Sequence, residues 1–94
     1  MYEYIVDKFL DDLWMRGRIL TEYGDYEFTA KVYDEGSGYG INNGRVSKLE
    51  LKDFEGNIVV NYDRGWDIYP SDNGFVLDVL EGVVGFLEEA PKIK

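Results

Sequence analysis

The sequence predicts an α+β fold: a four-stranded antiparallel meander with a short N-terminal helix and a C-terminal helix packed on one face of the sheet. Three observations carry this prediction. Apolar residues recur at helical spacing at both ends, they alternate with polar ones along the middle, and glycine-rich turns separate the alternating stretches. With 94 residues, 45% of them hydrophobic, the chain is long enough for one core and too short for two, so residues 1–94 are expected to form a single domain.

The first element expected is a short amphipathic helix over residues 2–12. Its apolar positions follow the helical period: Tyr2, Ile5, Val6, Phe9, Leu10 and Leu13. Charged residues fill the opposite side. An acidic pair in the last turn opposes the helix dipole, so we expect packing rather than intrinsic propensity to hold this helix.

A strand over residues 14–23 is expected to turn back at residues 23–25 and return over residues 26–33. The return strand shows the clearest alternation in the chain, which predicts one buried face and one solvated face. A glycine-rich loop over residues 34–44 follows, because its glycines and asparagines suit positive φ angles and disfavour a regular element.

A second hairpin is expected from strands over residues 45–52 and 57–62. Val46 is out of phase with Leu49, which predicts either a bulge or an early start for the first of these strands.

The last element expected is a helix over residues 75–90, which Pro91 would end. Three residues before it are competent N-caps: Ser71, Asp72 and Asn73. One apolar stripe faces the sheet, and acids share the other side with Gly82 and Gly85. Close approach by a partner, or a second apolar contact from the N-terminal helix, would explain these glycines.

Composition argues against most catalytic chemistry. The chain has no Cys and no His, so it lacks a disulfide framework, a thiolate nucleophile and the commonest general base and metal ligand. No segment has the carboxylate spacing of a calcium loop. We therefore expect no catalytic residue, no metal and no cofactor, although an acid/base enzyme built on Asp, Glu and Tyr remains an alternative.

The net charge of −9 predicts which partners the molecule meets. It opposes direct binding to nucleic acid and to anionic membranes, and it favours a basic protein surface. The start of the chain has no basic region followed by an apolar core, and charges interrupt every apolar stretch. We expect no signal peptide, no membrane span and a cytoplasmic location.

The glycine-rich loop contributes the first candidate contacts, Asp34, Glu35 and Tyr39. Its run over residues 36–40 resembles a phosphate loop, but acids precede it and a strand rather than a helix follows. The loop is either a flexible connection or a partner-contacting loop with Tyr39 at its tip.

The segment over residues 61–69 contributes Asp63, Arg64, Trp66 and Asp67. Aromatic residues and Arg with flanking acids are typical of interface hot spots. The structural alternative is that Trp66 plugs the end of the sheet while Arg64 pairs with a neighbouring acid.

The outer side of the last helix contributes Asp78, Glu81, Glu88 and Glu89. These acids form either an ordinary solvated face or a contact surface for a basic partner.

Several motifs resemble a family of small uncharacterised proteins from phages and mobile elements of Gram-positive bacteria. They are residues 14–17 (Trp-Met-Arg-Gly), 30–36, 39–41, 44–49 and 61–67 (Asn-Tyr-Asp-Arg-Gly-Trp-Asp). The resemblance covers roughly residues 14–70 and implies a genomic context, with no catalytic residue to carry over. Mobile elements encode small acidic proteins that occupy the nucleic-acid clefts of host defence enzymes, anti-CRISPR proteins among them.

Together these observations predict a small acidic, non-enzymatic protein-binding module that acts as an inhibitor of a nucleic-acid-binding host protein by nucleic-acid mimicry. Two alternatives stay open. One is a small enzyme or ligand-binding domain with a pocket lined by residues 63–67. The other is a self-assembling accessory protein, in which an amphipathic terminal helix makes a homo-oligomer.

Overall fold

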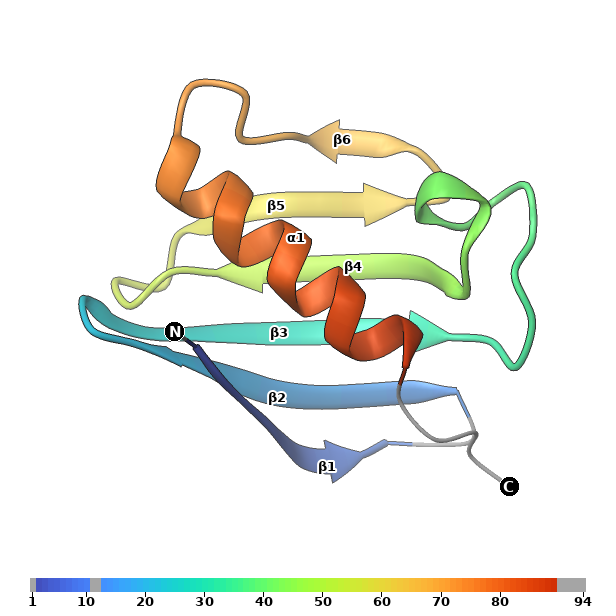
Figure 1. Ribbon diagram of the computed structural model, residues 1–94, viewed down its shortest axis with the longest axis horizontal. Helices are drawn as coiled ribbons and strands as arrows, with labels where there is room; N and C mark the ends of the chain where they lie inside the picture. The colour runs from blue at the N-terminus through green and yellow to red at the C-terminus, as the bar shows by residue number, and fades with distance from the viewer. Residues whose placement is uncertain (1, 11–12, 90–94) are drawn as a thin grey trace.

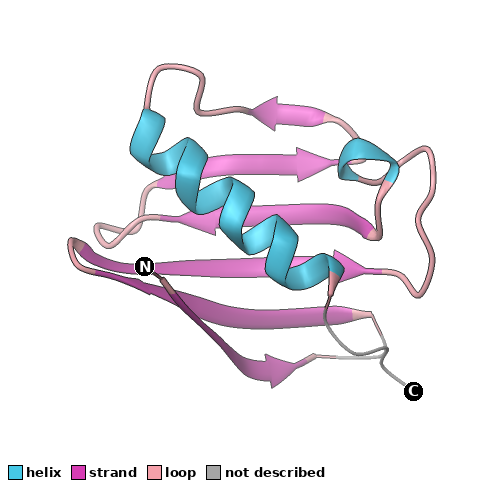
Figure 2. Cartoon of the chain, viewed as in Figure 1, coloured by secondary structure: helices cyan, strands magenta, loops and turns pink. Residues whose placement is uncertain are grey.

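The computed structural model describes residues 2–10 and 13–89, which form a six-stranded antiparallel sheet with one C-terminal helix (Figure 1). The strands follow one another across the sheet in chain order: β1 (Glu3–Phe9), β2 (Trp14–Thr21), β3 (Gly24–Val32), β4 (Val46–Lys52), β5 (Ile58–Asp63) and β6 (Trp66–Ile68). A 3-10 helix, η1 (Ile41–Asn43), precedes β4, and α1 (Gly74–Glu88) follows β6. Figure 2 shows α1 lying across one face of the sheet.

The prediction of an N-terminal helix is wrong, because the chain there forms β1. Tyr4 and Val6 pair with Ile19 and Gly17 of β2 and pack against the core, as a strand period of two requires. The register shifts between Val6 and Lys8, so Phe9 faces the same side as Tyr4 and Val6. This bulge lengthens one interval of the apolar pattern, and the result resembles helical spacing in the sequence.

The prediction of four strands is also wrong at the other edge, where β6 pairs with β5. Because all three residues of β6 are exposed, buried and exposed residues do not alternate along it, and the sequence contains no pattern that would predict a strand. Its formation depends on pairing with β5.

A bulge in β4 accounts for the phase change between Val46 and Leu49. Lys31 pairs with Lys48 and Val32 pairs with Val46, which leaves Ser47 as the extra residue. The Ser47 hydroxyl is buried and has no hydrogen-bond partner among the described residues.

The core lies between α1 and the face of the sheet beneath it. The helix contributes Val76, Val79, Leu80, Val83 and Leu87, and the sheet contributes residues that include Met15, Ile19, Phe28, Leu49, Leu51 and Val60. The side chain of Asn73, one of the three N-caps considered, accepts a hydrogen bond from the Val76 N–H at 3.1 Å. The helix end expected at Ala90 and Pro91 lies outside the described residues.

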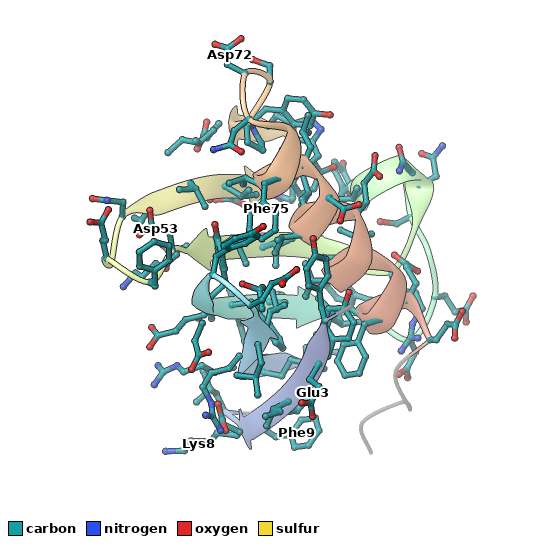
Figure 3. The ribbon with its side chains drawn as sticks, turned by 60° about the vertical axis from the view of Figure 1, so that its left-hand side comes forward. Glu3, Lys8, Phe9, Asp53, Asp72 and Phe75 are labelled. Atoms are coloured by element: carbon teal, nitrogen blue, oxygen red, sulfur yellow. The ribbon has the colours of Figure 1, made fainter. Side chains whose placement is uncertain are left out.

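Aromatic contacts join β1 and the neighbouring turns to α1. Phe75, in the first turn of α1, lies among the rings of Tyr2, Tyr23 and Tyr26 (Figure 3). Further along, Tyr4 stacks on Phe86 with ring centroids 5.0 Å apart. These contacts hold one side of the helix to β1, while its other side faces β6.

Candidate functional site

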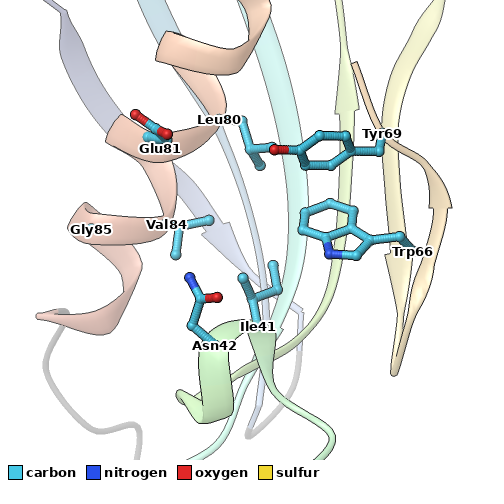
Figure 4. Close-up of a pocket in the computed structure, with 8 residues that line it drawn as sticks. All are labelled: Ile41, Asn42, Trp66, Tyr69, Leu80, Glu81, Val84 and Gly85. Carbon is cyan, nitrogen blue, oxygen red and sulfur yellow. The ribbon is translucent and has the colours of Figure 1, made fainter. Parts of the chain in front are cut away.

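The helix crosses the strands diagonally (Figure 1). A groove lies between α1, η1 and β6, and Figure 4 shows the side chains that line it. It has a volume of about 610 Å³. Its lining residues come from three separate parts of the chain: Ile41, Asn42, Trp66, Tyr69, Leu80, Glu81, Val84 and Gly85. We call this hollow the aromatic groove.

Two rings form the wall of the aromatic groove on the β6 side. Trp66 packs edge-on against Tyr62 and Tyr69, with centroids 4.8 and 4.9 Å away, and still leaves 42% of its surface exposed. The Tyr62 hydroxyl donates to the Tyr39 carbonyl at 2.9 Å, which ties the glycine-rich loop to β5. The exposed indole is therefore held in a fixed orientation by its neighbours.

The opposite wall belongs to α1, where the side chains are apolar or absent. Leu80 and Val84 line the groove, and a Cβ built on Gly85 would meet no atom within 4 Å. The missing side chain at Gly85 therefore leaves helix backbone open to the groove. Glu81, one helical turn before Gly85, adds an exposed carboxylate to this wall.

The end of the groove is closed by η1. Ile41 is buried at its base, while Asn42 adopts a left-handed conformation with φ of 54° and is exposed. Asn tolerates this conformation better than most residues. The turn therefore places an amide next to an apolar side chain at the mouth of the groove (Figure 4).

The lining residues can make apolar contacts and hydrogen bonds. They offer apolar contact area, an indole N–H, a phenol, an amide and a single carboxylate, but none of these residues forms a paired nucleophile and base. Across residues 2–10 and 13–89 the structure contains no cluster of acids placed to hold a metal ion.

Some of the candidate contact residues predicted in the glycine-rich loop and in the segment over residues 61–69 line a second hollow, which has a volume of about 530 Å³. Asp34, Glu35, Tyr39 and Arg64 line it together with Ser37 and Ser47. The Arg64 guanidinium lies over the Tyr39 ring at 5.7 Å, and Arg64 has a left-handed φ of 57°. Asp63 instead lies 3.6 Å from Lys48, and Asp67 is exposed on β6.

The predicted acids of the helix divide by role. Asp78 accepts a hydrogen bond from the Tyr2 hydroxyl at 2.5 Å, and Glu88 accepts hydrogen bonds from the backbone N–H groups of Arg45 and Val46, where β4 begins. Glu81 lines the aromatic groove, and Glu89 is exposed beyond the end of α1. These four acids therefore have different neighbours.

The sequence singled out Trp66 and Glu81, included Tyr69 in the segment over residues 61–69, and raised close approach by a partner at Gly85, but it did not group these residues into one site. It gave no indication of the remaining lining residues, which are Ile41, Asn42, Leu80 and Val84. Gly85 could have indicated the groove from the sequence, because a glycine on the outer side of a helix lowers helix propensity and therefore suggests another role for that position.

Fold and groove together define a small α+β domain with a preformed aromatic groove beside its helix. The family described as "Domain of unknown function (DUF7678)" matches residues 13–83, and the chain belongs to this family. No curated protein and no solved structure matches the chain. Within the described residues, α1 falls short of the length and apolar character needed to cross a membrane.

Proposed function

We propose that this protein is a small acidic, non-enzymatic and cytoplasmic protein-binding module that takes a segment of its partner into the aromatic groove. The observation that carries this proposal is the position of Trp66. It is braced by Tyr62 and Tyr69, yet a large part of its surface faces the open groove. Rigid exposed aromatic side chains are the anchors that dominate binding energy at protein interfaces.

The lining favours a segment that combines an apolar side chain with a basic one. Leu80, Val84 and the two rings provide apolar contact, while Glu81 provides a carboxylate at the same wall. The net charge of −9 adds long-range attraction for a basic partner, which raises the association rate more than the final affinity. A nucleic-acid-binding host protein, as the target of such an inhibitor, would present a basic surface of this kind.

A small-molecule ligand is the second candidate, because the groove volume falls within the range of about 300–1,000 Å³ typical of ligand pockets. This candidate shares the groove with the first, but it requires neither the acidic charge nor an extended partner.

The test is selection of short random peptides on the immobilised protein, followed by affinity measurements with two leucine variants. Gly85→Leu fills the groove, whereas Gly74→Leu makes the same change at an open glycine of α1 that lies outside the lining. We expect selected peptides to pair Arg or Lys with an aromatic or aliphatic residue. Their affinity should fall about tenfold or more with Gly85→Leu and stay unchanged with Gly74→Leu.

Charge is tested separately by Glu81→Gln, with Asp72→Asn as the control at an exposed acid in the loop before α1. Glu81→Gln should weaken the basic peptides and Asp72→Asn should not. Peptides that bind Gly85→Leu as well as the unmodified protein would overturn the proposal. Failure of every peptide, with small aromatic compounds perturbing the groove resonances in NMR spectra, would favour the ligand-binding candidate.

A further inference from the structure

The face of the sheet opposite α1 is covered by no helix or strand among the described residues. The strand registers place its side chains in three rows that cross the sheet. The first row is Arg18, Glu27 and Lys52; the second is Arg16, Thr29, Glu50 and Asn61; the third is Trp14, Lys31, Lys48 and Asp63. We call this surface the open face.

The open face holds most of the basic side chains of the described residues, although acids outnumber bases almost two to one in the whole chain. Two pairs of like charge lie directly opposite each other on adjacent strands, Lys31 with Lys48 and Lys8 with Arg16. Such pairs destabilise a sheet. They concentrate positive charge on one face of an otherwise acidic chain.

The six bases on this side of the sheet are only partly neutralised by four acids: Asp7, Glu27, Glu50 and Asp63. Asp7 is engaged by Arg18 through two hydrogen bonds of 2.8 and 2.9 Å, and Asp63 lies 3.6 Å from Lys48. Within residues 2–10 and 13–89, no carboxylate lies at ion-pair distance from Lys8, Arg16 or Lys31.

Aromatic rings lie within the basic part of the open face. The Lys31 and Lys48 ammonium groups lie 5.9 and 5.8 Å from the centre of the half-buried Trp14 ring. Lys31 also lies 5.3 Å from the ring of Tyr33, directly after β3. Beside them the face is hollowed by two adjoining depressions of about 330 and 410 Å³, which share Thr29 and Glu50.

We propose that the open face binds single-stranded nucleic acid. Lysine and arginine side chains of the outer rows would contact phosphates, and unpaired bases would enter the depressions and stack on Trp14, which lines one of them. Thr29, Glu50 and Asn61 in the middle row offer hydrogen-bond donors and acceptors to base edges. A segment made of acidic residues alone would use the positive charge but has no planar group to stack on the rings, so charge and rings together favour nucleic acid.

The net charge of the chain predicts the opposite, since −9 opposes binding to phosphate. The net charge, however, does not describe how the charges are distributed between the two faces of the molecule. The molecule measures 21 Å along its shortest axis, about two Debye lengths at 0.1 M salt. Salt therefore weakens the repulsion between the solvent-exposed acids on the helix side and a strand lying on the open face.

The test measures binding of fluorescent oligothymidylate and oligouridylate to the full chain, with polyglutamate as an anionic competitor without bases. In a Trp66→Phe background Trp14 is the remaining tryptophan, so stacking on it is followed by quenching of its fluorescence. Lys31→Gln and Lys48→Gln each remove one positive charge from the open face. Arg64→Gln removes one from the hairpin after β5 and serves as the matched control.

We expect saturable binding that quenches Trp14. Lys31→Gln and Lys48→Gln should each reduce the slope of log affinity against log salt by about 1, and Arg64→Gln should leave it unchanged. The proposal is overturned by the absence of binding at low salt or by equal effects of all three variants. It is also overturned if the oligonucleotide binds without quenching Trp14 and polyglutamate displaces it as effectively as unlabelled oligonucleotide does. The last result would identify the open face as a site for an acidic protein segment.

Discussion

Glu88 and Arg45 hold the end of α1 to the start of β4 by reciprocal hydrogen bonds. The Glu88 carboxylate accepts from the Arg45 backbone N–H at 2.8 and 3.0 Å, and the Arg45 guanidinium donates to the Glu88 carbonyl at 2.7 Å. An acid at the C-terminal end of a helix is unfavourable for the helix dipole. The hydrogen bonds compensate for this and set where the last turn of α1 lies.

Glu88→Ala should therefore lower the free energy of unfolding by about 1–3 kcal/mol, because the partly buried Arg45 N–H loses its acceptor. Glu89→Ala is the control, since the neighbouring side chain is exposed and should contribute less than about 0.5 kcal/mol. Urea denaturation measures both. Equal effects of the two variants would show that the reciprocal hydrogen bonds do not stabilise the fold.

The two glycines in the interior of α1, Gly82 and Gly85, should respond differently to alanine. The methyl group that Gly85→Ala adds would meet no atom within 4 Å, so this substitution should stabilise the protein by up to about 1 kcal/mol through the higher helix propensity of alanine. A Cβ at Gly82 would collide with the Tyr4 hydroxyl, so Gly82→Ala should give a smaller gain or a loss. In a Tyr4→Phe background that hydroxyl is absent, and Gly82→Ala should recover most of the gain. Thermal unfolding of the four variants tests this, and a gain at Gly82 equal to that at Gly85 in the unmodified background would contradict it.

The contact between Tyr2 and Asp78 predicts a loss of stability in alkali. The hydrogen bond to Asp78, with a smaller contribution from burial, raises the pKa of Tyr2 from 10.0 to about 12. A raised pKa means that folding favours the protonated hydroxyl, so its contribution is complete below pH 10 and disappears as the pH rises from 10 towards 12. Tyr2→Phe keeps the ring contact with Phe75 and removes the hydroxyl. The difference in urea midpoint between unmodified protein and Tyr2→Phe should shrink over this range, and a constant difference would refute the assignment.

Two serines on the same hollow should differ because only one is hydrogen-bonded. Ser47→Ala removes a buried hydroxyl without a partner among the described residues and should leave stability unchanged or raise it by about 1 kcal/mol. Ser37→Ala removes an acceptor 3.2 Å from the Tyr39 N–H and should cost about 0.5 kcal/mol. Calorimetry of both variants provides the comparison. A clear loss for Ser47→Ala would mean that its hydroxyl has a partner in solution.

Prediction from the sequence worked where one short period persisted over several residues. The alternation from Tyr26 to Val32 places four buried side chains on one side of β3, because a strand in the middle of a sheet keeps the same face to the core throughout. It failed at β1, where a bulge changes the period, and at β6, where three exposed residues have none. Both failures lie at the edges of the sheet, where a strand has one neighbour and burial constrains the sequence least.

The candidate sites depend on tertiary structure in a similar way. The sequence by itself determined the charge, the absence of Cys and His, the central strands and the apolar stripe of α1, since these follow from composition and local periodicity. Only the fold decided that Trp66 faces Gly85 and Ile41 across a groove, and that the basic residues share the face opposite the helix. The angle at which α1 crosses the sheet and the registers between strands set these groupings, and both arise from contacts between residues far apart in the chain.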